Sequence, residues 1–230
     1  MEIRTDLMIR DLREALDEEV RACRRCDGMN EKGVTQAAPG WGNEFSPVVI
    51  VGQSLCEQCM FREPPEPFYE RSGTLLDLAF DKADCKKEDL FITNVVHCHP
   101  PENRASHTHE IVNCSEYLYR ELEIVRPSLV IGLGKDAERV LTFFYPTARH
   151  LREPFETPKN VRSKKVPCLF FATHPAYIKR DHNEANRTAY VAGLANAIRW
   201  SRSKGPLQPV VPFRTCEGFG PEPVNADGDS

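Results

Sequence analysis

The chain has 230 residues, of which 40% are apolar, and a formal net charge of −4. This size and composition suit one domain that buries its own core, and they exclude a miniature protein that depends on disulfides. The sequence has no run of eighteen apolar residues, and its first residues lack the profile of a secretory signal. We therefore expect a soluble, cytoplasmic protein that does not enter a membrane.

The charge is unevenly distributed along the chain. The last sixteen residues contain four acids and no base, and this segment accounts for the whole net charge of −4. A group of basic residues lies late in the neutral remainder, namely Lys164, Lys165, Lys179, Arg180 and Arg187. A neutral body can present such a group to nucleic acid as one basic face, but a solvated surface of mixed charge explains it equally well.

The hydrophobic pattern predicts alternating helices and strands. Apolar residues at helical spacing predict an amphipathic helix over 6–22. Four short apolar runs predict buried parallel strands, at 48–51, 90–96, 129–134 and 167–173. Further helices are expected over 72–82, 107–125, 135–144 and 184–203. This order predicts an α/β fold, a three-layer α/β/α arrangement around a central, mostly parallel four-stranded sheet.

We expect residues 1–203 to form this domain and residues 204–230, rich in proline, glycine and acids, to form a disordered tail. Ligands of parallel sheets bind beyond the carboxyl ends of the strands. The informative residues should therefore follow each apolar run.

Four segments near the expected strand ends carry distinctive residues. They are Gly52-Gln53-Ser54-Leu55-Cys56, Pro67-Phe68-Tyr69-Glu70-Arg71-Ser72-Gly73, Thr93-Asn94-Val95-Val96-His97-Cys98-His99-Pro100-Pro101-Glu102-Asn103-Arg104 and Thr173-His174-Pro175-Ala176-Tyr177. The ordered set, spread over about residues 10–200, resembles the family 4 uracil-DNA glycosylases. In that family a Gly-Glu-Ala-Pro-Gly loop, a Pro-Phe segment, a Thr-Asn-Val-Val strand end running into Cys-x-Pro-Pro-x-Asn-Arg, and a His-Pro-Ala/Ser loop surround the base pocket.

The resemblance implies a role for each matched residue. Gly52 would line the pocket, Phe68 would stack on a base flipped out of DNA, and Asn94 would pair with the polar edge of that base. His174 would donate a hydrogen bond to the base as the glycosidic bond breaks. Together with Asn94 and His174, the loop residues Gln53 and Ser54 form the expected catalytic set. The DNA backbone would lie along Arg104, Tyr177, Lys179 and Arg180. Purely structural roles are the alternatives: core packing for Phe68, capping of a strand end for Asn94, and a buried, hydrogen-bonded position for His174.

The chain contains nine cysteines, an odd number, and the cytosol keeps thiols reduced, so we do not expect a disulfide framework. The family resemblance implies a [4Fe–4S] cluster held by Cys23, Cys26, Cys98 and Cys114. A zinc site formed by the two C-x-x-C pairs, Cys23/Cys26 and Cys56/Cys59, is the alternative, although it leaves Cys98 and Cys114 unexplained. Cys85 and Cys168 are expected to be small buried residues, and Cys216 to be incidental.

The first motif loop departs from the family pattern. Family 4 has a carboxylate at its second position and family 1 has Gln-Asp-Pro-Tyr in this loop, whereas this chain has Gln53-Ser54-Leu55-Cys56. A catalytic carboxylate positions water and stabilises positive charge on the sugar. The acids that follow could replace it: Glu57, Glu63, Glu66 and Glu70. The loop also lacks the family 1 tyrosine, so the pocket could admit a base larger than uracil.

Three functional hypotheses follow. The first is a DNA glycosylase that hydrolyses the N-glycosidic bond of uracil or a related pyrimidine in base-excision repair. The second is a glycosylase for a bulky modified cytosine in phage DNA, acting in antiviral defence. The third is a DNA-binding member of the superfamily that has lost catalysis. All three have DNA as the partner, and by resemblance we expect a monomer.

Overall fold

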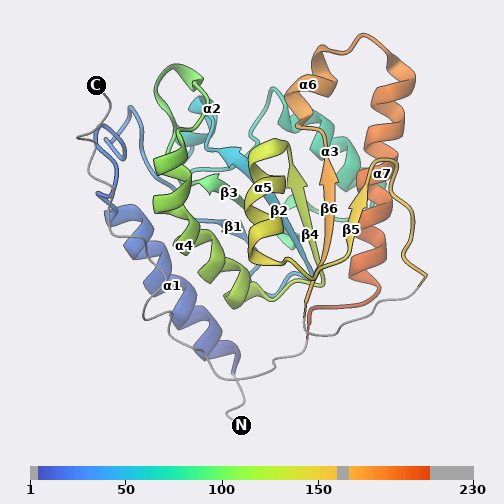
Figure 1. Ribbon diagram of the computed structural model, residues 1–230, viewed down its shortest axis with the longest axis horizontal. Coiled ribbons are helices and arrows are strands. Elements are labelled where there is room, and N and C mark those ends of the chain that lie inside the picture. Colours follow the sequence, from blue (N-terminus) through green and yellow to red (C-terminus); the bar gives the residue numbers. More distant parts are fainter. Residues whose placement is uncertain (1–4, 160–165, 208–230) are drawn as a thin grey trace.

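The computed structural model describes residues 5–159 and 166–207, which form a six-stranded sheet between two layers of helices (Figure 1). Lys164, Lys165, Cys216 and the predicted tail from residue 208 onward lie outside the described residues. The strand order is β1-β3-β2-β4-β6-β5. The predicted three-layer α/β/α architecture is confirmed.

The sheet has two more strands than predicted. Its centre consists of four parallel strands, β2 (Val48–Ser54), β3 (Phe91–Val96), β4 (Leu129–Leu133) and β6 (Cys168–Ala172), which match the four apolar runs. The edges are β1 (Trp41–Gly42), antiparallel to β3, and β5 (His150–Arg152), parallel to β6. The prediction of four strands is wrong because segments of two and three residues are too short to show an alternating pattern.

Each face of the sheet is covered by its own helices. On one face, α3 (Gly73–Lys82), α6 (Pro175–Arg180) and α7 (Glu184–Arg202) pack together. On the other face lie α1 (Asp6–Ala22), α4 (Thr108–Val125) and α5 (Lys135–Phe144), with α1 and α4 side by side (Figure 1). A short helix, α2 (Glu57–Met60), follows β2, and two 3₁₀ turns occupy Lys87–Asp89 and Pro101–Asn103.

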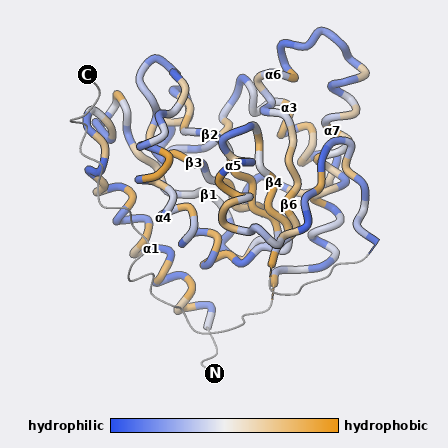
Figure 2. Tube along the Cα trace, in the orientation of Figure 1, coloured by the Kyte–Doolittle hydropathy of each residue, from blue (hydrophilic) through white to orange (hydrophobic). Residues whose placement is uncertain are grey.

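The alternation of side chains along β2 explains why both layers are needed. Val48 and Ile50 belong to the core beneath α3 and α7, whereas Val49 and Val51 belong to the core beneath α1, α4 and α5. Figure 2 shows β4 and β6 as apolar segments, and every residue of both strands is buried. Within the described ranges, no helix has both the length and the apolar character that a membrane crossing requires.

Candidate active site and cysteine cavity

Three of the predicted base-binding residues contact one another at the carboxyl ends of β2 and β3. The parallel register places Gly52 beside Asn94. A Cβ atom on Gly52 would lie 2.5 Å from Asn94 Oδ1 and 2.8 Å from Phe68 Cζ. Asn94 is 6% exposed and Phe68 is 9% exposed, so both are buried. Glycine at position 52 is therefore what allows the amide and the ring to approach the strand end.

The position of Phe68 depends on the turn that precedes α3. Phe68 adopts a positive φ of 52°, and its carbonyl oxygen accepts a hydrogen bond from Lys87 Nζ at 3.4 Å. A Cβ atom on Gly73 would lie only 1.8 Å from that same oxygen, so the turn requires glycine there. The Phe68 ring centroid is 6.1 Å from that of His174. The fourth predicted base-binding residue therefore faces the other three.

His174 is held in a defined protonation state by the start of α6. It is the N-cap of that helix, and the Ala176 N–H donates to its Nδ1 at 3.3 Å. Because Nδ1 accepts a hydrogen bond, we assign the ring proton to Nε2. Burial lowers the pKa of His174, and the nearby Arg180 charge lowers it further. The imidazole is therefore a neutral donor at physiological pH.

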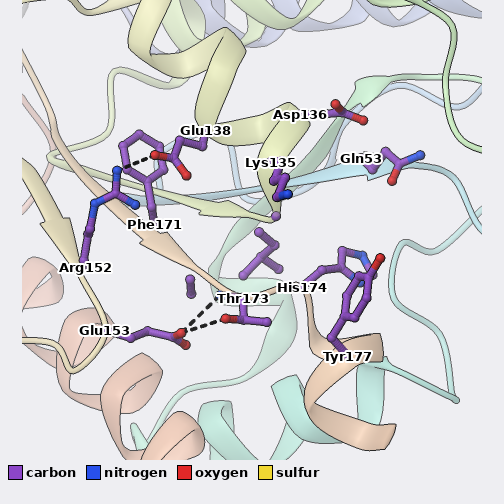
Figure 3. Close-up of a pocket in the computed structure, with 13 residues that line it drawn as sticks. Gln53, Lys135, Asp136, Glu138, Arg152, Glu153, Phe171, Thr173, His174 and Tyr177 are labelled. Carbon is purple, nitrogen blue, oxygen red and sulfur yellow. Dashed lines mark hydrogen bonds and ion pairs between the residues drawn. The ribbon is translucent and has the colours of Figure 1, made fainter.

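An open cavity of about 680 Å³ lies beside these residues, at the ends of β4, β5 and β6 (Figure 3). Its volume falls in the range of small-molecule sites. Gln53, His174 and Tyr177 line it, together with Leu133, Gly134, Lys135, Asp136, Glu138, Arg152, Glu153, Phe171, Ala172 and Thr173. Gly52, Phe68 and Asn94 are not part of this lining and pack against one another next to it. The base-binding group and the cavity therefore share His174 as their common wall.

The acids that line the cavity are not the ones that the sequence indicated. Glu57, Glu63, Glu66 and Glu70 are outside the lining, and Glu66 instead pairs with Lys87 Nζ at 2.7 Å. The lining carboxylates come from two other segments, namely Asp136, Glu138 and Glu153. Asp136 lies three residues past β4, in the first turn of α5, and could have been found by reading past that strand. Glu153 follows β5, which the sequence does not reveal.

Two of the lining carboxylates have partners, as the dashed lines in Figure 3 show. Arg152 donates to Glu138 Oε1 at 2.5 Å. Glu153 Oε2 accepts from Thr173 Oγ1 at 2.9 Å and from the Thr173 N–H at 3.3 Å. Thr173 directly precedes His174, so Glu153 supports the strand end from which the histidine projects.

The loop after β2 contributes the other two residues of the predicted catalytic set. Gln53 is half-buried at the cavity, and its Nε2 donates to Ser106 Oγ at 3.5 Å. Ser54, also half-buried, pairs with Val96 in the β2–β3 register and lies outside the cavity lining. Of the two, only Gln53 presents its side chain to the open space.

The predicted DNA-binding residues lie in two places. Tyr177, Lys179 and Arg180 are on α6 beside His174, and Tyr177 is 66% exposed. The Arg180 guanidinium lies 4.8 Å from the centre of the Tyr177 ring, and Lys179 Nζ donates to the Arg71 carbonyl at 2.6 Å. Arg104 instead forms a two-pronged ion pair with the buried carboxylate of Glu110, at 2.5 and 3.0 Å.

Four cysteines that are distant in the sequence line one small cavity on the α1/α4 side of the sheet. Cys23 and Cys26 follow α1, Cys98 lies just after β3, and Cys114 is on α4. Asn113 Nδ2 donates to Cys26 Sγ at 3.3 Å. Burial, followed by the neighbouring cysteines, raises the pKa of the Cys98 thiol. In the part of the chain that the structure describes, no three His, Cys, Asp or Glu side chains adopt a metal-ligating arrangement.

A buried polar network connects this four-cysteine cavity to β3. The fully buried Glu121 accepts from the Gly40 N–H at 2.7 Å and from Thr93 Oγ1 at 2.5 Å. His97 Nε2 lies 3.2 Å from Glu121 Oε1. Although burial opposes both charges, Glu121 raises the pKa of His97 to about 10, and His97 lowers the pKa of Glu121. Because Cys98 follows His97, the network positions the strand end that carries a lining cysteine.

The second C-x-x-C pair does not join the first. Cys56 and Cys59 form a disulfide with each other, contrary to the expectation of reduced thiols. They belong to a separate apolar cluster with Ala38, Leu55 and Met60. The zinc alternative is therefore wrong, because sulfurs bonded to each other are not thiolate ligands. Cys168 is buried as predicted, while Cys85 is only half-buried.

Comparison with known proteins identifies the family. The sequence model of the uracil DNA glycosylase superfamily matches residues 39–197 of this chain. The chain is 36% identical over 173 residues to the type-4 uracil-DNA glycosylase of Archaeoglobus fulgidus, covering 72% of this chain and 83% of the relative. It is 28% identical over 197 residues to the type-4 enzyme of Thermotoga maritima, covering 85% and 97%. A type-5 uracil-DNA glycosylase of Pyrobaculum aerophilum is 46% identical over 52 residues, 23% of each chain. This protein therefore belongs to the uracil DNA glycosylase superfamily.

Proposed function

We propose that this protein is a DNA glycosylase that hydrolyses the bond between uracil and deoxyribose and leaves an abasic site in DNA. The observation that carries the proposal is the convergence of Gly52, Phe68, Asn94 and His174 from four separate segments. The names of the type-4 relatives favour uracil over the modified-cytosine and silent alternatives. We place the activity in base-excision repair within the cell, carried out by the domain of residues 1–203.

In the proposed mechanism, the pocket residues recognise the flipped base by its face and its edge. Phe68 stacks on the face of the base, and the Asn94 amide donates to and accepts from its edge. A neutral amide has both capacities, as the edge of uracil requires. Because Gly52 has no Cβ to collide with either side chain, both groups can act on one base.

His174 acts on the charge that bond cleavage creates. When the bond between the base nitrogen and the sugar carbon breaks, the electron pair stays on the base and spreads onto its oxygen. The Nε2–H of the neutral His174 donates to that oxygen and stabilises the developing charge. Water then adds to the sugar carbon and gives up one proton, and the departing uracil anion takes up one proton, so the products are neutral uracil and an abasic site.

Gln53 takes the place of the family carboxylate in this proposal. It lies at the cavity, where its side-chain oxygen can accept a hydrogen bond from the attacking water. An amide orients the water but does not remove its proton. We therefore expect slower excision than a carboxylate at the same position would support.

The DNA strand follows α6 and the loop that leads into α4 in this proposal. Tyr177, Lys179 and Arg180 lie next to His174 and flank the backbone of the flipped nucleotide. The Arg104 charge is paired with Glu110, so Arg104 positions its loop more than it attracts phosphate. These assignments follow from position and charge.

We further propose that Cys23, Cys26, Cys98 and Cys114 hold a [4Fe–4S] cluster. Four cysteines from three elements line one cavity, and this donor set is what such a cluster needs. Bound there, a cluster would link the segment after α1, the segment after β3, and α4 through its cysteine ligands. The hydrolytic steps above use none of its redox chemistry.

The test uses a uracil-containing duplex beside phage DNA that carries hypermodified cytosine. We expect abasic sites only in the uracil substrate. Asn94→Ala and His174→Ala should each lower single-turnover excision by about 10²–10³-fold, the cost of removing one preorganised donor. His182→Ala, at an exposed position outside the cavity lining, is the matched control. Abasic sites only in the modified DNA, or full turnover in both pocket variants, would overturn the proposal.

A further inference from the structure

The Cys56–Cys59 disulfide has one accessible and one buried sulfur. Cys56 is the half-buried N-cap of α2, whereas Cys59 is only 1% exposed. The Cys59 N–H donates to Cys56 Sγ at 3.1 Å. In thiol–disulfide exchange an accessible sulfur is attacked and the other sulfur leaves. Because of this asymmetry, we expect a reductant to attack the sulfur of Cys56, and the sulfur of Cys59 to be the leaving group.

The same disulfide contacts two of the four segments that form the base-binding group, those of Gly52 and Phe68. On one side it follows Leu55, whose carbonyl oxygen accepts from the buried His99 Nδ1 at 2.9 Å. Leu55 is three residues from Gly52. On the other side, the Tyr69 N–H donates to Cys59 Sγ at 3.4 Å, and the Glu66 N–H donates to the Cys59 carbonyl at 3.1 Å. Tyr69 directly follows Phe68, the proposed stacking residue.

Few other contacts hold the segment between Cys59 and Phe68. Arg62 lies 4.4 Å from the centre of the Tyr69 ring, and Lys87 contacts both Glu66 and the Phe68 carbonyl. Phe61 is 65% exposed. Residues 61–64 are exposed, so this part of the segment depends on the small apolar cluster around the disulfide, whereas Phe68 at its end packs in the main core.

We propose that Cys56–Cys59 is a redox-active disulfide that exchanges with a dithiol reductant and controls the order of the Phe68 segment. The oxidised pair keeps Phe68 in position, and the reduced pair releases it. The effect on catalysis rests on the proposed glycosylase function, but the exchange and the ordering do not.

The exchange balances as a two-electron transfer. A thiolate of the reductant attacks Cys56 Sγ, the bond to Cys59 Sγ breaks, and Cys59 leaves as a thiolate that takes up a proton. The second thiol of the reductant then attacks the mixed disulfide and releases Cys56, which is also protonated. The reductant is oxidised to a disulfide and the protein is reduced to a dithiol.

Reduction must displace part of the loop. Bonded sulfurs are about 2.05 Å apart, and two free thiols need van der Waals separation. Cys59 is buried against Leu55 and Met60, so the Cys56 side of the pair and the segment after Cys59 have to give way. The Tyr69 N–H then loses its place beside Cys59 Sγ, and Phe68 moves with it.

The first experiment follows thiols and backbone order in the full-length protein, purified anaerobically with its iron. Dithiothreitol is added stepwise, free thiols are alkylated, and peptides are read by mass spectrometry. We expect Cys56 to be labelled before Cys59, both to re-form the disulfide with oxidised glutathione, and the buried Cys168 to stay unlabelled. Amide exchange over residues 61–70 should rise at least about tenfold on reduction.

The second experiment compares variants. Cys56→Ser/Cys59→Ser should show the faster amide exchange without reductant and no response to it, while Cys85→Ser should respond like the parent protein. Uracil excision should fall about tenfold to a hundredfold on reduction of the parent, because a displaced stacking ring misplaces the base. No exchange at the pair, or unchanged amide protection after reduction, would overturn the proposal. Loss of uracil excision in both redox states would overturn the proposed function instead and leave the thiol and amide results to decide the switch.

Discussion

Two C-x-x-C pairs of the same spacing have different surroundings and bonding in this protein. Cys23 and Cys26 follow the end of α1 and face two further cysteines across a small cavity. Cys56 is the N-cap of α2, Cys59 lies within that helix, and the two bond to each other beside apolar neighbours. The first pair therefore belongs to a four-cysteine site, and the second closes a loop beside the base-binding group.

The difference shows that the neighbours of a cysteine pair, and not its spacing, decide what the pair does. The first pair meets Cys98 and Cys114 because β3 and α4 pack against the region after α1. The second pair meets Ala38, Leu55 and Met60, which offer no ligand. Two segments of the same spacing thus line a four-cysteine cavity in one place and form a disulfide in the other.

The largest effect should be on iron content, when one cysteine of each region is replaced by serine in separate variants. Cys98→Ser removes a proposed cluster ligand, so we expect the purified protein to lose most of its iron and its brown absorbance. Cys56→Ser should keep both, because Cys56 is not part of the four-cysteine cavity. Iron content per chain and visible absorbance are the measurements. Equal iron in the two variants would remove the distinction between the pairs.

The next effect concerns the buried network behind the four-cysteine cavity. Glu121→Ala leaves the His97 charge, the Gly40 N–H and the Thr93 hydroxyl without their shared acceptor. Breaking a buried pair in this way costs about 3–5 kcal/mol. We expect that loss in the free energy of unfolding, measured with urea. Glu18→Ala, at an exposed position on α1, should change it by less than about 0.5 kcal/mol, and a similar value for Glu121→Ala would contradict the network.

A smaller effect is expected in the loop that leads to the second pair. Gln53→Glu restores a carboxylate at the second position of the motif, beside the cavity. A well-placed general base raises a rate by about a hundredfold or more. We therefore expect the rate of single-turnover uracil excision to rise in Gln53→Glu by up to about a hundredfold. Gln58→Glu, inside the C-x-x-C segment and outside the cavity lining, should leave the rate unchanged. An unchanged rate in Gln53→Glu would mean that water is oriented elsewhere.

The smallest effect is the pH dependence that the lowered pKa of His174 imposes on the base-binding group. Burial and Arg180 place the pKa of His174 below its ordinary value of 6.5. Since the folded pKa is lowered, the neutral form and its stabilising contact with the Ala176 N–H are complete above pH 6.5 and are lost as pH falls through the folded pKa. Excision should therefore be independent of the His174 charge down to pH 6.5 and decline below it. NMR titration of the ring checks this, and a pKa at or above 6.5 would contradict it.

Sequence motifs went furthest where chemistry follows directly after a strand. Gly52 and Asn94 each stand near the end of a strongly apolar run, and His174 follows another, so the rule for parallel sheets brought them to one edge. Phe68 was found only through the family resemblance, because its segment is a turn with a positive φ at the ring-bearing residue. Glu153 was missed because β5 has three residues and no readable pattern.

The sequence by itself determined the four central strands, the approximate limits of the five longer helices and the residue types of the candidate site. These features depend on local hydrophobic periodicity and on short motifs, which any window of the chain displays. The family resemblance already grouped the four cysteines of the small cavity, whereas only the tertiary structure decided that Cys56 bonds to Cys59 and which acids line the open space. These contacts form when segments pack in three dimensions, and local sequence patterns do not indicate that packing.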